Sequence, residues 1–283
     1  MIINQKDKGM KTLLLYFAVA CTMSFKVAEV QKRNPASFPE KLPGDLELDH
    51  STIRKYIMTT GYFDYDLKGN FLRKRRVTGK YTGGLDGDSA RWNDVYISEV
   101  NKLTTQFPKG LKQDYMENFI YQPNEKIINE VFFKAIPEAN MLIQNLIWDV
   151  FAFEVLAYSC WDSLKRNKEY HAQNLSSEIE LAGEGTFENR EILLTWIGLT
   201  ELNNETCAII KYSAMNNPLK IELDNLTMSG RSHYWGEVYV SLADKQIEYA
   251  TLSEDVVTDI LFNGQSNNIL GYTLRIINLS KIN

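Results

Sequence analysis

The side chains that could form a hydrolytic site lie in the C-terminal third of the sequence. Ser232, His233 and Asp255 would supply a nucleophile, a base and an acid. Adjacent residues of a strand point to opposite faces, so Ser232 and His233 are not expected to share the hydrogen bond of a catalytic triad. We interpret them as a polar entrance to a strand. A hydrolase that uses His233, Glu184 or Asp255 as its acid or base stays an alternative.

The sequence carries no common nucleotide, metal or esterase motif. It contains no Walker loop, dinucleotide fingerprint, His-Glu-x-x-His or Gly-x-Ser-x-Gly pattern. His50, His171 and His233 are far apart, which argues against a zinc site. Residues 86–88, with Asn93 and Asp94 nearby, offer oxygen ligands for calcium but lack the full EF-hand loop. We therefore predict a solvated glycine turn there, no metal and no cofactor.

Two groups of charged residues could also carry a function. Residues 73–76 read Arg-Lys-Arg-Arg, and on a strand residues 73 and 75 would share one face while 74 and 76 share the other. They could contact anionic lipid head groups or an acidic glycan, or protect the edge of a sheet by charge, which we favour. Asp149, Glu154 and Asp162 interrupt an apolar helix, where burial would raise a carboxyl pKa. We interpret these three as a polar stripe of the helix.

Aromatic side chains are the candidates for ligand binding. Phe, Tyr and Trp make up 12% of the chain, enough to supply both a core and a binding surface. Trp196, Trp235 and Tyr239 lie in strand-like patterns and could line an apolar cleft for a lipid or stack against sugars. The alternative is that they belong to the core between a sheet and a helix.

The strands that position these residues are predicted in two regions. Residues 52–98 form a β-hairpin region, with strands over Tyr56–Tyr65, Phe71–Thr82 and Trp92–Ser98. Residues 178–279 form an antiparallel sheet, because tight turns join its strands. Its predicted strands are Glu178–Phe187, Ile192–Leu202, Thr206–Met215, Leu219–Leu226, Trp235–Ala243, Gln246–Leu252, Val256–Phe262 and Ile269–Leu279.

Turns and glycines give this sheet its expected shape. Asn203-Asn204 and Asp244-Lys245 are candidates for two-residue hairpins, and Asn216-Asn217-Pro218 is a candidate turn. Glycines inside strand patterns indicate bulges or bends, which curl a sheet. The glycines concerned are Gly183, Gly185, Gly198 and Gly236.

The region between the two groups of strands is predicted to be helical. Within residues 99–170 we expect a short helix over Ser98–Phe107 and a helix over Pro137–Lys168 that is long or broken near Asp149. Polar residues interrupt the long helix, so we expect no membrane span. The predicted fold class is α+β, with a strongly curved antiparallel β-sheet, an incomplete barrel, packed on that helix.

The N-terminal residues predict export. Lys11 precedes an apolar run that meets Ala18-Val19-Ala20, a pattern typical of a signal-peptidase site. We therefore expect a signal peptide over residues 1–20, with Met10 as an alternative start. Cys21 stands where a bacterial lipobox would place a lipidated thiol. Residues 21–50 are a predicted tether or linker, and residues 51–283 a single α+β domain.

Composition limits the partners. The 31 Lys and Arg residues against 36 Asp and Glu residues make the chain mildly acidic, which argues against nucleic acid as a partner. The remaining cysteines, Cys160 and Cys207, could pair, but we interpret them as buried thiols.

An exported chain that ends in antiparallel strands with glycines at Gly183, Gly185, Gly230 and Gly236 resembles the Lol-type lipoprotein-carrier superfamily. It also resembles uncharacterised envelope domains of Bacteroidetes. The resemblance covers about residues 178–279 by pattern. It implies an antiparallel sheet that curls into an incomplete barrel, is closed by helices and holds acyl chains.

These observations predict an exported cell-envelope protein, periplasmic or associated with the outer membrane. The first hypothesis is a non-catalytic binding or carrier module for an apolar, lipid-like ligand, which Trp196, Trp235 and Tyr239 would contact. The second is a structural or protein-interaction module with a filled core. A hydrolase of an envelope polymer is the third. Membrane association is expected only through a lipid anchor at Cys21, and the sequence does not set the oligomeric state.

Overall fold

The computed structural model describes residues 39–48, 52–134, 136, 140–263 and 268–282. Its contacts divide the chain into two units, Met1–Phe38 and Pro39–Asn283. The predicted signal peptide, Cys21 and most of the predicted tether lie outside the described residues. The elements below all belong to the second unit.

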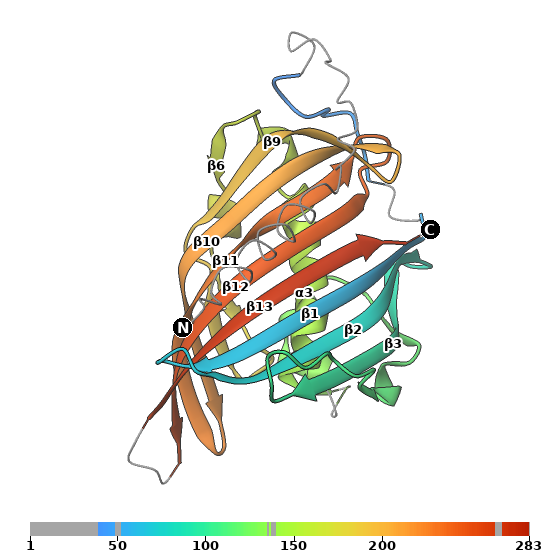
Figure 1. The fold of residues 1–283 in the computed structure, drawn as a ribbon. Helices are drawn as coiled ribbons and strands as arrows, with labels where there is room; N and C mark the ends of the chain where they lie inside the picture. Colours follow the sequence, from blue (N-terminus) through green and yellow to red (C-terminus); the bar gives the residue numbers. More distant parts are fainter. Residues whose placement is uncertain (1–38, 49–51, 135, 137–139, 264–267, 283) are drawn as a thin grey trace, which may run out of the picture. The chain divides into compact units, whose positions relative to one another are not determined.

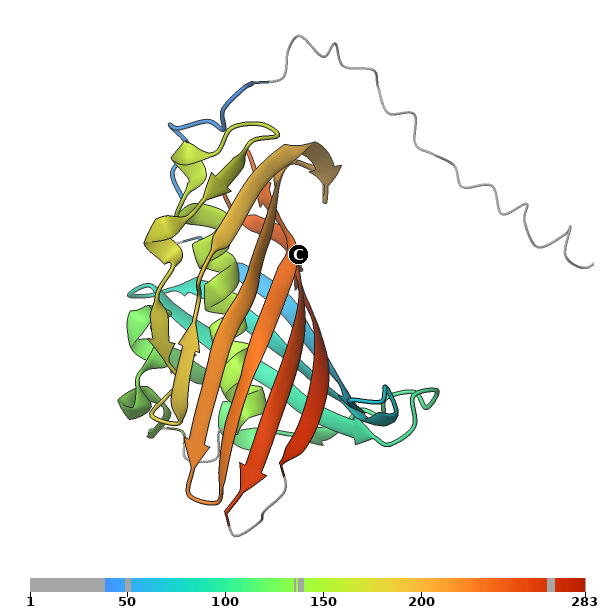
Figure 2. The same cartoon turned by 90° about the vertical axis from the view of Figure 1, so that its left-hand side faces the viewer.

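One antiparallel sheet dominates the second unit (Figure 1). Its strands are β1 (Arg54–Asp66), β2 (Phe71–Leu85), β3 (Ser89–Val100), β4 (Leu111–Lys112), β5 (Phe119–Tyr121), β6 (Glu169–His171), β7 (Glu178–Glu180), β8 (Gly185–Glu188), β9 (Ile192–Leu202), β10 (Glu205–Leu223), β11 (Leu226–Ser241), β12 (Ile247–Phe262) and β13 (Ile269–Lys281). Their order is β4-β3-β2-β1-β13-β12-β11-β10-β8-β7, with β5 on β3, β9 on β10 and β6 on β9. The predicted antiparallel sheet is confirmed, and it curves without closing (Figure 2).

β1 and β13, the first and last strands along the chain, pair with each other in the middle of the sheet. β1 and β13 are in register from Tyr56 opposite Lys281 to Asp66 opposite Gly271. The N-terminal strands therefore extend the C-terminal sheet, instead of forming a separate layer.

Two predicted strand breaks are wrong. β10 runs through Asn216-Asn217-Pro218, where Asn216 has a φ of 58° and the register with β11 shifts by a bulge. Proline fits there because β9 pairs with β10 only up to Ala214 and the pairing of β10 with β8 begins only at Leu219. No neighbour on that side therefore needs the N–H that proline lacks. β12 likewise spans both strands predicted between 246 and 262.

The predicted turns at Asn203-Asn204 and Asp244-Lys245 are confirmed in position. Asn203 and Asn204 have φ values of 52° and 65° and join β9 to β10. Asparagine tolerates this left-handed backbone better than most residues, which suits a tight hairpin. Asp244 and Lys245 lie in the connection between β11 and β12, and Lys245 has a φ of 58°.

The helical prediction holds only for its central part. α3 spans Met141–Tyr158, is capped by the Asn140 side chain, which accepts a hydrogen bond of 3.0 Å from the Leu142 N–H, and does not break at Asp149. The predicted helix over Ser98–Phe107 is wrong, because β3 continues to Val100 and residues 101–107 are turns and loop. The other short elements are η2 (Asp114–Met116), η3 (Glu125–Ile128), α2 (Glu130–Lys134), η4 (Trp161–Ser163) and η5 (Gln173–Leu175).

α3 lies on the concave side of the sheet (Figure 2). Its buried side chains belong to the same hydrophobic cluster as those of the strands, and the exposed fraction of Phe153 is 0%. The Trp161 indole N–H donates to the Pro43 carbonyl at 2.8 Å, and Leu42 is buried. Residues near 42 therefore pack on the folded unit, inside the range predicted as a tether. The α3 side chains that fill this side are Ile143, Leu146, Ile147, Val150, Phe153 and Leu156.

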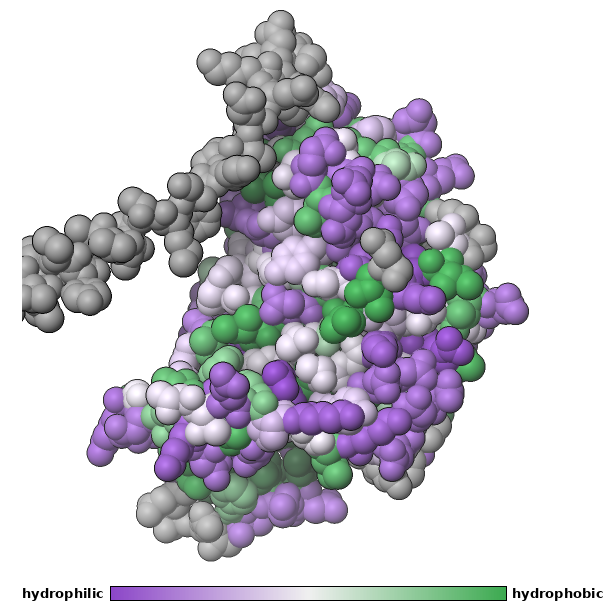
Figure 3. Space-filling view, turned by 45° about the vertical axis from the view of Figure 1, so that its right-hand side comes forward, coloured by the Kyte–Doolittle hydropathy of each residue, from purple (hydrophilic) through white to green (hydrophobic). Residues whose placement is uncertain are grey.

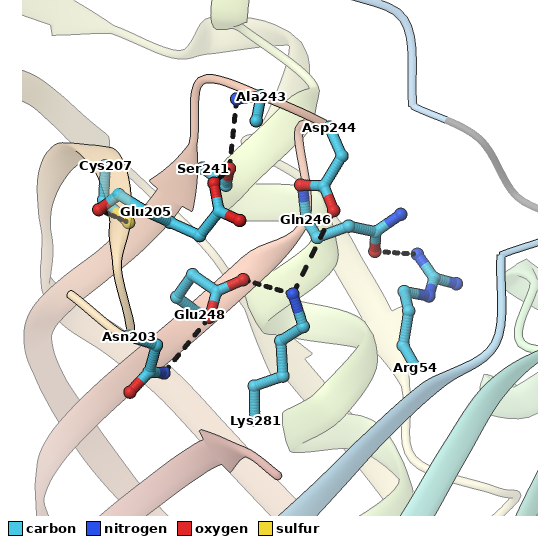
Figure 4. A network of polar contacts seen from close by, with 10 residues as sticks. All are labelled: Arg54, Asn203, Glu205, Cys207, Ser241, Ala243, Asp244, Gln246, Glu248 and Lys281. Carbon is cyan, nitrogen blue, oxygen red and sulfur yellow. Dashed lines mark hydrogen bonds and ion pairs between the residues drawn. The ribbon is translucent and has the colours of Figure 1, made fainter. Parts of the chain in front are cut away.

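A polar network joins the strand ends near the β9–β10 hairpin (Figure 4). Lys281 of β13 forms an ion pair with Glu248 of β12, and the Asn203 side-chain amide donates to the same carboxylate at 3.1 Å. Beside them, Arg54 of β1 donates to Gln246 at 3.2 Å. The network therefore ties β1, β12 and β13 to the β9–β10 turn.

Cys160 and Cys207 are free and buried, as predicted. Burial raises the pKa of Cys207 to about 12, so this thiol stays protonated at neutral pH.

Candidate ligand-binding site

The three aromatic residues predicted to bind a ligand do not share one cleft. Trp196 of β9 is fully buried opposite Ile210 on the inner face, and its indole N–H donates to the Gly198 carbonyl at 2.9 Å. Trp235 of β11 is 39% exposed on the outer face, and Tyr239 is partly exposed on that same face. Trp196 therefore belongs to the core, whereas Trp235 and Tyr239 lie on one surface.

The neighbours two residues away in each strand could have revealed this difference. Trp235 alternates with His233 and Glu237, which are polar, whereas Trp196 alternates with the apolar Leu194. Residues two apart in a strand share a face, so the first pattern indicates solvent and the second a core.

A groove of about 510 Å³ surrounds Trp235 on the outer face. Ser213 of β10 and Ser253 of β12 stand directly opposite Trp235 on either side. These two small side chains leave space beside the indole ring, which a larger pair would fill. The groove is lined by Glu169, Leu193, Thr195, Ile197, Lys211, Tyr212, Ser213, Trp235, Gly236, Glu237, Thr251 and Ser253.

Strand register arranges the outer face in rows that run across the strands. The Trp235 row contains Leu193, Ser213, Trp235, Ser253 and Ile276. Two residues further along each strand, the Glu237 row contains Glu169, Thr195, Lys211, Glu237, Thr251 and Asn278. The Tyr239 row contains Ile209, Tyr239, Tyr249, Ser280 and Ile57. A polar row therefore separates two rows that carry aromatic and aliphatic side chains. Figure 3 shows hydrophilic and hydrophobic residues interspersed on the face that it draws.

The carboxylate of Glu237 is held by its neighbour. The Tyr239 hydroxyl donates to Glu237 Oε2 at 2.8 Å, and the Tyr239 ring packs edge-on against Tyr249 at 5.6 Å between centroids. Burial, with Glu237 next to it, raises the pKa of Tyr239 to about 12. Tyr239 is thus a hydrogen-bond donor at neutral pH, and it fixes where the negative charge of Glu237 lies.

The floor of the groove is closely packed. Tyr212, from the inner face of β10, lies over Gly236 and donates to the Thr251 carbonyl at 2.5 Å. A Cβ atom added at Gly236 would stand 1.9 Å from that carbonyl oxygen and 2.6 Å from the Tyr212 hydroxyl oxygen. Only glycine fits between these groups, so β11 and β12 approach each other closely beneath Trp235.

The predicted polar strand entrance is wrong, because β11 begins at Leu226 and Ser232 and His233 lie within it. The residues of the predicted group do not meet as a triad. Ser232 faces inward and donates to Glu254 at 2.5 Å. His233 faces outward, where its Nδ1 atom accepts the Asn216 N–H at 3.3 Å, and Asp255 accepts from the Tyr272 hydroxyl at 2.7 Å.

The basic run at residues 73–76 has a structural role on both faces of β2. Arg73 and Arg75 bind Asp64 at 2.8 Å and 2.9 Å, whereas Lys74 and Arg76 each lie 4.8 Å from the centre of the Phe107 ring. The predicted division between the two faces is confirmed. The edge-strand interpretation is wrong, because β2 lies between β1 and β3.

The carboxylates of the helical region lie in different environments. Asp162 is exposed, but Asp149 is buried and binds Arg275 of β13 at 2.5 Å, which a solvated polar stripe does not explain. Arg275 also forms an ion pair with Glu254. Burial, helped by the charge of Glu254 and opposed by Arg275, raises the pKa of Asp149 to about 6. Burial also raises the pKa of Glu154.

Two further features of the described residues concern a metal site and a membrane-spanning helix. Within the described ranges, no group of three or more His, Cys, Asp or Glu side chains is arranged to hold a metal ion. Residues Met141–Ser163 are long and apolar enough to cross a membrane, a property that core helices share, and half of that apolar stretch is buried in the fold.

Comparison with solved structures finds distant likenesses only in the fold, one of which is with lipovitellin. No family model matches the chain, and no curated protein matches it. A solved structure on lipid–protein interactions in lipovitellin aligns with 84% of this chain and 26% of that chain, at 11% identity and a TM-score of 0.41. A likeness of this degree does not identify a shared ligand.

Proposed function

We propose that this chain is an exported cell-envelope protein that binds or carries an apolar, lipid-like ligand without catalysis, and that the ligand lies in the Trp235 groove. The observation that carries the proposal is an indole that is 39% exposed between two serines, in a groove of about 510 Å³. Binding sites for small molecules commonly have volumes of about 300–1,000 Å³. Leu193 and Ile197 would contact the apolar part of the ligand beside Trp235.

The concave side of the sheet is a less suitable site. The Lol-type resemblance implies an incomplete barrel that holds acyl chains on that side. Here buried side chains of α3 stand against the inner face instead, and Trp196 is among the fully buried residues. The outer groove leaves this packing intact, since a ligand can enter it without displacing a helix.

Export rests on the residues before the folded unit. The apolar run that ends at Ala20, followed by Cys21, supports cleavage and a lipid anchor as parts of the proposal. The mass of the mature N-terminus tests both: cleavage after Ala20 is expected, with an added acyl mass on Cys21. An uncleaved N-terminus in the cytoplasmic fraction would overturn the export part.

Bound lipid tests the main proposal. Protein purified from its own membrane fraction is analysed by native mass spectrometry and by solvent extraction, as wild type, Trp235→Ala and Trp196→Phe. We expect Trp235→Ala to lower the bound lipid about ten-fold, since a change of about 1.4 kcal/mol in binding is ten-fold in affinity. Trp196→Phe changes the core on the other face and should leave the lipid content as in wild type. Equal lipid content in wild type and Trp235→Ala would overturn the proposal.

The second candidate is a structural or protein-interaction module. The filled inner face favours it, because a core that packs its own side chains needs no ligand. Ligand-free wild-type protein that also fails to take up added amphiphiles, and that co-purifies with a partner dependent on Trp235, would establish this reading in place of the first.

A further inference from the structure

We infer that the Trp235 groove selects an amphiphile with a zwitterionic head group of the phosphocholine or phosphoethanolamine class. In this arrangement Glu237, between Trp235 and Tyr239, binds the ammonium group, and Lys211 binds the phosphate. The inference rests on the proposed function and adds the chemistry of the ligand's head group.

The ammonium position follows from the alternation along β11. Trp235, Glu237 and Tyr239 are each two residues apart and point to the same face, with about 7 Å between successive positions. A cation at this position is attracted both by the charge of the carboxylate and by the negative faces of the two aromatic rings. The Tyr239 hydroxyl binds Glu237 at 2.8 Å, so the carboxylate is oriented before a ligand arrives.

The phosphate position follows from the strand register. Lys211 of β10 stands directly opposite Glu237, and side chains in such pairs have Cβ atoms about 5 Å apart. Among the residues that the structure describes, none is an ion-pair or hydrogen-bond partner of the Lys211 ammonium group, which is exposed. A free cation beside an oriented carboxylate matches the two charges of a zwitterion.

The charges of the groove also argue against other head groups. Its lining carries Glu169, Glu237 and Lys211, and Glu169 is 3.4 Å from His171 Nε2. The lining of the groove thus carries one more negative than positive side chain, so an anionic amphiphile meets repulsion. A neutral head group leaves both charges unused, and a purely cationic one leaves Lys211 without a partner.

Single-chain probes of matched tail length test this selection. Isothermal titration calorimetry, below the critical micelle concentration of each probe, compares dodecylphosphocholine with dodecyl maltoside, dodecyl sulfate and dodecyltrimethylammonium. We expect dodecylphosphocholine to bind about ten-fold more tightly than the neutral and anionic probes. Free phosphocholine should bind more weakly than dodecylphosphocholine. Equal affinity of the two would overturn the assignment of the ligand as a lipid.

Three variants separate the two charges. Lys211→Gln should weaken dodecylphosphocholine binding about five-fold or more and leave dodecyltrimethylammonium binding no weaker, because only the first carries a phosphate. Glu237→Gln should weaken the binding of both. Lys55→Gln, an exposed lysine on β1 outside the groove, is the matched control and should bind like wild type.

The outcomes distinguish the two proposals. If all tailed probes bind equally well and Trp235→Ala still abolishes binding, the groove is a ligand site but the head-group inference is wrong. Lys211→Gln without effect on dodecylphosphocholine would also overturn the inference. If none of the probes binds, or Trp235→Ala has no effect on any of them, the proposed function itself fails.

Discussion

Replacing Asp149 by asparagine should change how stability depends on pH. Asp149 and Glu254 share one guanidinium, that of Arg275, at a site where the side chains of all three are only 9–11% exposed. One negative charge there has no counter-ion in the cluster. Burial therefore raises the pKa of Asp149 from 3.8 to about 6 in the folded protein.

The direction of the effect follows from this shift. A carboxyl whose pKa is higher in the folded state favours folding most below its unfolded pKa, and that advantage is lost as pH rises through the folded value. The difference between a pKa of 3.8 in the unfolded state and about 6 in the folded state corresponds to about 3 kcal/mol of unfolding free energy in total. About 2 kcal/mol of this is lost between about pH 4.5 and about pH 7.5.

Urea unfolding followed by tryptophan fluorescence measures the effect. Wild type and Asp149→Asn are compared at about pH 4.5 and about pH 7.5. The unfolding free energy of wild type should fall by about 2 kcal/mol relative to that of the variant as pH rises. Asp162→Asn, which removes an exposed carboxylate in the neighbouring η4, is the control and should show a constant difference from wild type. If wild type instead gains stability relative to Asp149→Asn as pH rises, attraction to Arg275 outweighs burial and the reasoning is wrong.

The remaining predictions concern packing contacts and use thermal or urea unfolding. Gly236→Ala should destabilise the protein by about 2 kcal/mol or more, because the added methyl group would stand 1.9 Å from the Thr251 carbonyl oxygen. An unchanged melting temperature would show that the strands there can separate. Tyr212→Phe loses only the hydroxyl that binds this carbonyl and should cost about 1 kcal/mol. Phe107→Ala removes the ring on which two cations of β2 lie, should cost about 1–2 kcal/mol, and should speed trypsin cleavage within residues 101–110. Cleavage at the wild-type rate would contradict the last prediction.

Local patterns predicted the parts of the fold that depend on neighbouring residues. The strand Ile192–Leu202 has the predicted bounds, and Asn203-Asn204 forms the turn after it. The division of residues 73–76 between two faces also follows from alternation alone. In each case the prediction follows from alternation or turn propensity within a few residues, although the partners of residues 73–76 lie further away along the chain.

Local patterns could not predict interactions between residues that are far apart in the sequence. Asp149 and Arg275 are 126 residues apart, so the sequence showed a carboxylate in an apolar helix without its partner. Asn216-Asn217-Pro218 has the composition of a turn, and only the gap between β9 and β8 turns it into a bulge. The sequence indicates Trp235 as a candidate for a cleft but not the shape of its groove, because Ser213 and Ser253 become neighbours of Trp235 only in the sheet.

The pairing of β1 with β13 means that the sheet is completed only after the last of its strands has been made. The first strand lies within residues 54–66, and its partner emerges only with residues 269–281. Until then the N-terminal strands and the C-terminal strands are two ribbons with open edges, which readily pair with other chains. This order keeps the sheet unfinished until β13 is available to join the two groups of strands. A chaperone that covers the open edge of β1 until β13 pairs with it would protect the chain from aggregation.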